Sequence, residues 1–71
     1  MTNKLELELQ IKRCNVTKRE LAQKLGISEM ALSNKMNNES EFKASEISIL
    51  EKELKMSKEQ RDAIFFNQIV D

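Results

Sequence analysis

The side chains with which enzymes usually catalyse reactions or bind metals are scarce in this chain. It contains no His, Tyr or Trp and a single Cys, so the common acid–base, nucleophilic and metal-ligand sets are missing. Its Asp and Glu residues alternate with Lys and Arg, as they do on solvated helix faces. Judged against what an active site needs, the sequence predicts no enzyme, no metal site and no cofactor.

The remaining chemistry is that of charged and amide side chains, and the charges are unevenly distributed. Residues 1–27 hold six cations and three carboxylates, which gives a net charge of +3. Residues 28–43 come to −1 and residues 44–71 to −2, so the whole chain is neutral. Zero net charge is unusual for a small protein that binds nucleic acid, but the front part of the chain is basic.

Composition predicts one small all-α domain over residues 1–71. The chain has no Pro and one Gly, at position 26, and it is rich in Glu, Lys, Leu and Gln. Cys14 has no intramolecular disulfide partner, and we expect it to be a buried apolar side chain in a protein of a reducing cytoplasm. No stretch has the length and apolarity of a signal peptide or a membrane span, so we expect a cytoplasmic protein with no membrane contact.

Capping residues predict where the helices begin and end. Thr17 and Glu20 form a capping box, and the helix that follows stops at Gly26, which suits a left-handed C′ position. Further N-caps are expected at Ser28, at Ser45 and, with Gln60, at Ser57. The helix after Ser45 would carry the apolar stripe Ile47, Leu50 and Leu54, and the last helix would run through Ala63, Ile64 and Phe66. With one helix before Thr17, the prediction is five short helices.

The first of these elements is ambiguous. Residues 4–12, KLELELQIK, alternate apolar and polar side chains with the period of a half-buried strand. A lone strand would have nothing to pair with in an otherwise helical domain. We therefore favour a helix over residues 3–14, capped by Asn3 or Thr2.

A helix there separates its leucines into two groups. Leu7 and Ile11 face the core, whereas Leu5 and Leu9 lie on nearly the opposite side. The second pair is either two scattered surface leucines or a stripe for a dimer or a partner protein. The segment FFNQIV, residues 65–70, poses a similar choice between core packing and a contact between subunits.

Residues 17–37, TKRELAQKLGISEMALSNKMN, contain two short helices separated only by GIS. Two helices that cross steeply after so short a turn need a small residue where they touch, and Ala22 is suitably placed. They also need positive φ in the turn, which Gly26 allows. Leu21 and Leu32 would fill the wedge between them, and the outer face of the second helix would remain free to enter a major groove.

These residues resemble the helix-turn-helix of the Cro/CI-type (Xre-like) regulators, a five-helix all-α DNA-binding family common in phages. The resemblance continues through Phe42, SEISILEKEL, MSKEQ and IFF, and it spans roughly residues 5–66. Over this range the chain is similar to small lysogeny-switch regulators from phages of Gram-positive hosts. The resemblance implies a lambda-repressor-like helix-turn-helix domain and, as partner, double-stranded operator DNA.

Carried onto this sequence, the resemblance also implies which residues touch DNA. The base-reading residues would be Glu29, Met30, Ser33, Asn34 and Asn37. The phosphate contacts would be Thr17, Lys18, Arg19, Ser28, Lys35, Asn38 and Lys43. Asn34 could pair with adenine, Glu29 could accept from cytosine N4, and Met30 could touch a thymine methyl. The lysines and Arg19 could equally be solvated side chains, and Glu29 could merely favour the helix dipole.

Two functions are compatible with this pattern. A Cro-like regulator would bind operator DNA as a homodimer, and the basic cluster at residues 12–24 favours it. An anti-repressor would retain the fold but bind the DNA-binding domain of a phage repressor and occlude its reading surface. Zero net charge, Glu29 beside Met30, and the spare leucines Leu5 and Leu9 favour this second function, because relatives often carry a basic or amide residue where Met30 stands and Met packs adaptably against other proteins.

Overall fold

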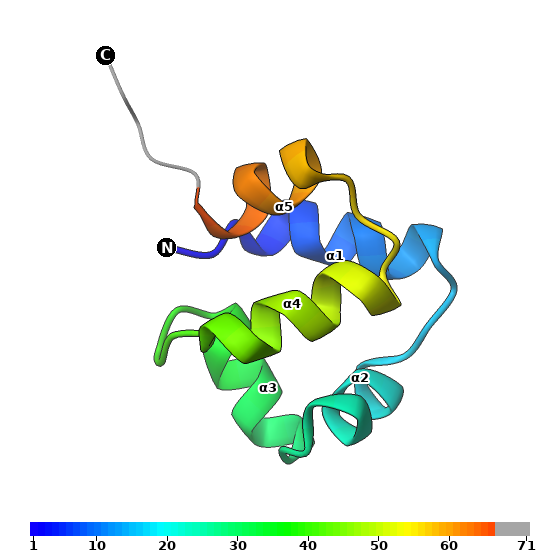
Figure 1. Cartoon of the computed structure of the whole chain (residues 1–71). Helices are drawn as coiled ribbons and strands as arrows, with labels where there is room; N and C mark the ends of the chain where they lie inside the picture. Colours follow the sequence, from blue (N-terminus) through cyan, green and yellow to red (C-terminus); the bar gives the residue numbers. More distant parts are fainter. Residues whose placement is uncertain (67–71) are drawn as a thin grey trace.

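A computed structural model describes residues 1–66, and within them the chain forms five helices and no strand. The helices are α1 (Lys4–Arg13), α2 (Lys18–Leu25), α3 (Glu29–Met36), α4 (Ala44–Glu53) and α5 (Lys58–Phe65). In Figure 1, α2 and α3 lie at the bottom, α1 and α5 at the top, and α4 crosses the front between them. The predicted five-helix all-α fold is confirmed. Residues 67–71, which include most of FFNQIV, lie outside the described residues.

The segment KLELELQIK is a helix. Asn3 is its N-cap: the side-chain oxygen accepts a hydrogen bond from the Glu6 amide at 3.2 Å. The Asn3 amide also donates to the Ile64 carbonyl at 2.7 Å, which joins the start of α1 to α5. Leu7 and Ile11 are buried as predicted. The alternation of the sequence is therefore misleading, because the pairing strand it would require does not exist in the described fold.

One core lies between the five helices. Helix α2 packs on α3 and α4, and α5 packs on α1 and α4. The most completely buried large side chains come from α1 to α4: they are Leu7, Leu21, Leu32, Met36, Leu50 and Leu54. Each such side chain contributes roughly 1.5–3 kcal/mol when it leaves water, so the core is the main source of stability in a chain this small.

Helix α1 also closes the C-terminal end of α4. The amide nitrogen Nε2 of the buried Gln10 donates to the Leu54 carbonyl at 2.8 Å, and Cys14 Sγ donates to the same oxygen at 3.0 Å. This carbonyl would otherwise be one of the unpaired acceptors that end every helix. Cys14 is half-buried and packs against the core, close to what the sequence suggested. The burial of Gln10 could not be predicted from the spacing of the apolar residues.

The predicted cap of the last helix is confirmed, and that of α4 is wrong. Ser57 Oγ accepts from the Gln60 amide at 3.1 Å, and Gln60 Oε1 accepts from the Ser57 amide at 2.9 Å. Helix α4 instead begins one residue before Ser45, with Lys43 at the N-cap. Glu46 replaces the missing side-chain cap in part, because its carboxylate accepts from the Lys43 amide at 2.8 Å.

Helix α5 runs through Ala63 and Ile64 as predicted, and Phe66 is its C-cap. Ile64 and Phe65 are buried, whereas Ala63 and Phe66 are exposed. The Phe65 ring packs edge-to-face on Phe42, with 5.4 Å between the centroids. Phe66 lies one position beyond the end of α5, and it is 51% exposed.

Candidate nucleic-acid interface

The start of α2 is fixed by a complete capping box. Thr17 Oγ1 accepts from the Glu20 amide at 3.1 Å, and Glu20 Oε1 accepts from the Thr17 amide at 2.9 Å. Lys18 and Arg19 follow in the first turn, and both are exposed. The first turn of α2 therefore presents two cations beside amides that carry partial positive charge.

The turn between α2 and α3 is built as predicted. Gly26 has a φ of 73°, in the left-handed region, and the Ile27 amide returns to the Ala22 carbonyl at 3.0 Å. Ala22 is only 2% exposed, which shows how closely the helices around it pack. Ser28 then caps α3, since its hydroxyl oxygen accepts from the Ala31 amide at 3.0 Å.

One side of helix α3 is buried in the core, and the other side faces the solvent. Leu32 and Met36 are each 1% exposed and face the core. Met30 is 74% exposed, and Asn34, one turn later, is half-buried. The five residues predicted to read bases share this outward side, which we call the α3 outer face: Glu29, Met30, Ser33, Asn34 and Asn37. It holds one carboxylate, one large apolar side chain and three neutral polar groups, and no cation.

Exposed cations lie at the starts of α2 and α4. Arg19 at the start of α2 and Lys43 at the start of α4 are exposed, and neither forms an ion pair with another described residue. Lys18 is also exposed, although its Nζ lies 3.6 Å from Glu8 Oε2 of α1. Such a pair between exposed groups is weak and leaves the lysine available to a stronger anion.

Lys35 differs from the other predicted phosphate contacts, because its ammonium group is used inside the protein. Nζ lies 2.6 Å from Glu46 Oε1, and the two side chains are 12% and 8% exposed. Burial alone would raise the pKa of Glu46, but the hydrogen bonds from Lys35 and from the Lys43 amide lower it overall. Lys35 is therefore a link between α3 and α4 and not a free cation at the surface.

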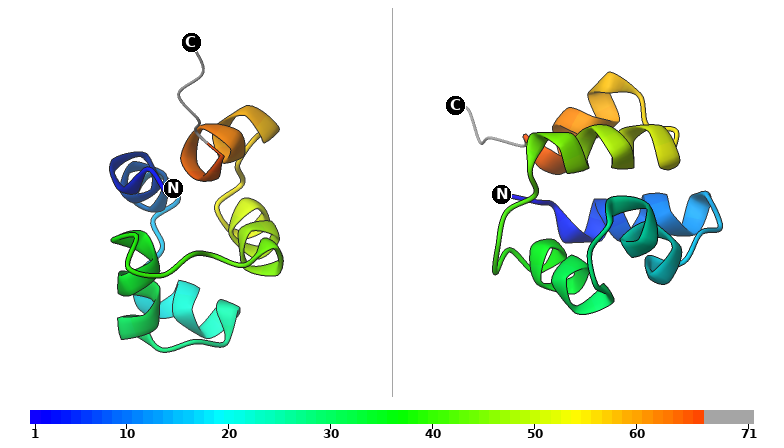
Figure 2. Two further views of the ribbon diagram at one scale, coloured as in Figure 1. Left: turned by 90° about the vertical axis from the view of Figure 1, so that its left-hand side faces the viewer. Right: turned by 60° about the horizontal axis from the view of Figure 1, so that its bottom comes forward.

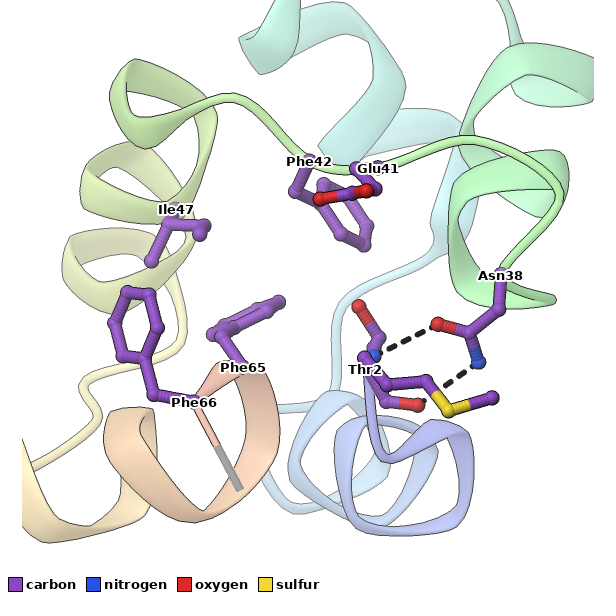
Figure 3. A pocket seen from close by; sticks show the side chains of 8 residues that line it. Thr2, Asn38, Glu41, Phe42, Ile47, Phe65 and Phe66 are labelled. Carbon is purple, nitrogen blue, oxygen red and sulfur yellow. Dashed lines mark hydrogen bonds between the residues drawn. The ribbon is translucent and has the colours of Figure 1, made fainter. Parts of the chain in front are cut away.

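Asn38 is also engaged within the protein. Its side chain accepts from the Thr2 amide at 2.7 Å and donates to the Thr2 carbonyl at 3.0 Å, as Figure 3 shows. Its φ of 65° agrees with the expectation that Asn tolerates the left-handed conformation at this position. The amide that we expected at a phosphate instead fixes the N-terminal residues to the end of α3. The partner, 36 residues away in sequence, could not be inferred from local spacing.

The same two residues border a pocket of the described structure. This pocket, of about 230 Å³, lies between the N-terminal residues, the loop after α3 and the end of α5 (Figure 3). Phe42, Phe65 and Phe66 supply its aromatic side chains and Glu41 its carboxylate. None of the residues of the α3 outer face lines it, so the pocket and that face are separate features.

Two properties of residues 1–66 concern metals and membranes. No group of three Cys, Asp or Glu residues there is placed to hold a metal ion. No helix in that range has the length and apolarity to cross a membrane. Comparison of the chain with protein-family models, with curated proteins and with solved structures finds no significant match.

Proposed function

We propose that this chain is a phage-type helix-turn-helix transcription regulator that binds operator DNA through the α3 outer face. It would act as a homodimer on two half-sites about one helical turn apart, in the cytoplasm of a bacterial host and without a cofactor. Binding there would block or redirect transcription in a genetic switch. The resemblance of residues 17–37 to the helix-turn-helix of the Cro/CI-type regulators suggests this function.

One observation carries the proposal. A three-residue turn with Gly26 in the left-handed region joins α2 to α3, and the residues on the polar side of α3 are exposed or half-buried along the helix. A helix presented in this way fits a major groove, where Asn34 can form two hydrogen bonds with adenine. The starts of α2 and α4, with Arg19 and Lys43, would then meet the phosphates on the two sides of the groove.

Replacement of a cation at the start of α2 tests the proposal. Arg19→Ala should weaken binding to a duplex from the promoter region beside the gene, and it should reduce the slope of log K against log salt by about one per protomer. Fluorescence anisotropy at several salt concentrations measures both quantities. Lys58→Ala is the matched control, because Lys58 is an exposed cation in the first turn of α5, on the far side of the molecule from α3 (Figure 1).

The same titration separates base reading from phosphate binding. Asn34→Ala should cost about 1–3 kcal/mol on the cognate duplex and little on a scrambled one, since only base contacts carry sequence information. If Arg19→Ala and Lys58→Ala bind alike, or if wild-type protein does not bind the promoter duplex at low salt, the proposal is wrong.

A second function is favoured by the chemistry of Met30. This side chain is 74% exposed beside Glu29, on a face whose five residues include no cation. An apolar residue next to an acid is better suited to a basic protein surface than to phosphate. The alternative is therefore an anti-repressor whose α3 outer face covers the DNA-binding domain of a partner repressor.

This alternative is tested by size-exclusion chromatography. The chain is mixed with the phage repressor that is encoded by the neighbouring gene. A discrete complex should form, and Met30→Asp should abolish it by burying a charge in the interface. Ala63→Asp, on an exposed position of α5, should leave it unchanged. A complex that survives Met30→Asp would show that the α3 outer face is not the contact surface.

A further inference from the structure

Helix α1 carries exposed leucines on the side that faces away from the core. Leu5 is 67% exposed and Leu9 is 39% exposed, one turn apart on the same side of the helix. Figure 2 (left) looks along α1 and shows the other described helices on one side of it only. We call Leu5, Leu9 and the charged residues on either side of them the α1 outer face.

Charges on both edges of this face change sign in the same direction along the helix. The helical period places Glu8 and Lys12 on one edge and Glu6 and Arg13 on the other. On each edge the carboxylate is nearer the N-terminus of α1 and the cation is nearer its C-terminus. This order is favourable for the helix dipole. It also makes each edge complementary in charge to the same edge of a second α1 helix in antiparallel orientation.

Contacts within the protomer leave most of these groups available. Neither Glu6 nor Lys12 forms an ion pair with another described residue, and Lys12 is exposed. Arg13 Nη1 donates to Gln10 Oε1 at 3.2 Å, which holds the guanidinium near the edge and leaves its other nitrogens free. Glu8 lies 3.6 Å from Lys18, a pair between exposed side chains.

We infer that the α1 outer face binds a second copy of this chain, with the two α1 helices antiparallel about a two-fold axis. In this arrangement Glu6 lies opposite the partner subunit's Arg13, and Glu8 lies opposite the partner subunit's Lys12, once for each protomer. Leu9 packs near the axis, and Leu5 covers the methylene groups of the opposing cations. A parallel pair would place like charges opposite each other, so the pattern selects one orientation.

The interface is small, so the dimer is weak and reversible. One leucine stripe with four ion pairs at its rim falls below the size of a permanent interface, and we expect a dissociation constant on the order of 100 µM. The inference concerns α1 and goes beyond the function proposed for α3. Its test contains no nucleic acid and no repressor, so its failure and that of the proposed function can be told apart.

Sedimentation velocity over a wide range of protein concentrations tests the inference. Wild-type protein should pass reversibly from monomer to dimer, and Glu6→Arg should raise the dissociation constant about tenfold because it repels Arg13 of the partner subunit at two symmetric places. The double variant Glu6→Arg with Arg13→Glu should restore dimerisation. Glu59→Arg is the matched control, because it also reverses an acid in the first turn of a helix.

Leu9→Asp provides a second test at the centre of the interface, and circular dichroism should show that it still folds, because Leu9 lies on the side of α1 away from the core. It should leave the protein monomeric throughout the concentration range. Wild-type protein that stays monomeric overturns the inference. So does a dimer that is unchanged by Glu6→Arg or Leu9→Asp, or a double variant that does not recover.

Discussion

At the scale of single residues, the pair Lys35–Glu46 determines how α3 is held. Glu46 Oε1 accepts from Lys35 Nζ at 2.6 Å and from the Lys43 amide at 2.8 Å, so one carboxylate joins α3 to the start of α4. Burying two charges is costly, and a pair of this kind stabilises mainly because either partner alone would be worse. We interpret it as the contact that sets the angle of the α3 outer face.

The lowered pKa of Glu46 makes stability depend on pH in a defined direction. A carboxylate whose folded pKa is below its unfolded value of about 4.5 adds stability above that value, and this contribution is lost as the pH falls through the folded pKa. Glu46→Gln should therefore reduce the free energy of unfolding by about 1.5 kcal/mol at pH 7 and by less in acid, measured by urea denaturation at both pH values.

Glu51→Gln is the control for this prediction. Glu51 lies 3.3 Å from Arg61, but these side chains are 30% and 25% exposed, so the loss should be well under 1 kcal/mol. Equal losses in the two variants, or a loss in Glu46→Gln that does not shrink in acid, would show that the buried pair does not stabilise the fold as described.

Residue types alone could not show which polar groups the fold uses internally. Lys35 and Asn38 have the types and places of phosphate contacts, yet one binds Glu46, 11 residues away, and the other binds Thr2, 36 residues away. Such partners meet only because helices from different parts of the chain pack together. The residues of the α3 outer face were easier to predict, because the period of one helix decides which side they share.

At the scale of elements, the first four helices end in the same way. Each is followed by a residue with positive φ, and these are Asn15 at 56°, Gly26 at 73°, Asn38 at 65° and Lys55 at 51°. In each case the amide of the next residue reaches the carbonyl five residues back, at 2.8 to 3.4 Å. This is the Schellman motif, and it explains how turns without Pro and with one Gly can be so short.

Substitution at these positions should act through backbone strain. An added Cβ at Gly26 meets nothing within 4 Å, so Gly26→Ala should cost only the left-handed conformation, about 1 kcal/mol. Lys55→Gly should instead relieve strain and stabilise by about 0.5 kcal/mol, after the greater freedom of unfolded Gly is counted. Thermal unfolding should show opposite shifts of the midpoint, and shifts of the same sign would contradict this explanation.

The ends of elements were predictable where a residue type has one strong preference. Thr17 and Ser57 begin helices because an acid or amide stands three residues later, and Gly26 ends one. Lys55 has no such preference, so its left-handed conformation could not be predicted. Ser45 was a poor guide for a related reason: Glu46 binds the Lys43 amide and begins α4 earlier than a side-chain cap at Ser45 would.

At the scale of the whole molecule, neutral net charge conceals an asymmetry. The basic residues 1–27 form α1 and α2, whereas the acidic end of the chain forms α4 and α5. Fold class and helix number followed from composition, caps and periodicity. The charge of the surface around α3 could not be predicted from the sequence, because Lys35 is buried in an ion pair with Glu46.

The titration of wild-type protein with the promoter duplex at increasing salt tests the central claim most directly. With Lys18, Arg19 and Lys43 at phosphates in both protomers of a dimer, log K should fall with log salt at a slope of about −5. The cognate duplex should bind more tightly than a scrambled one at each salt concentration. A slope near zero, or equal binding to both duplexes, would contradict the claim that the α3 outer face reads DNA.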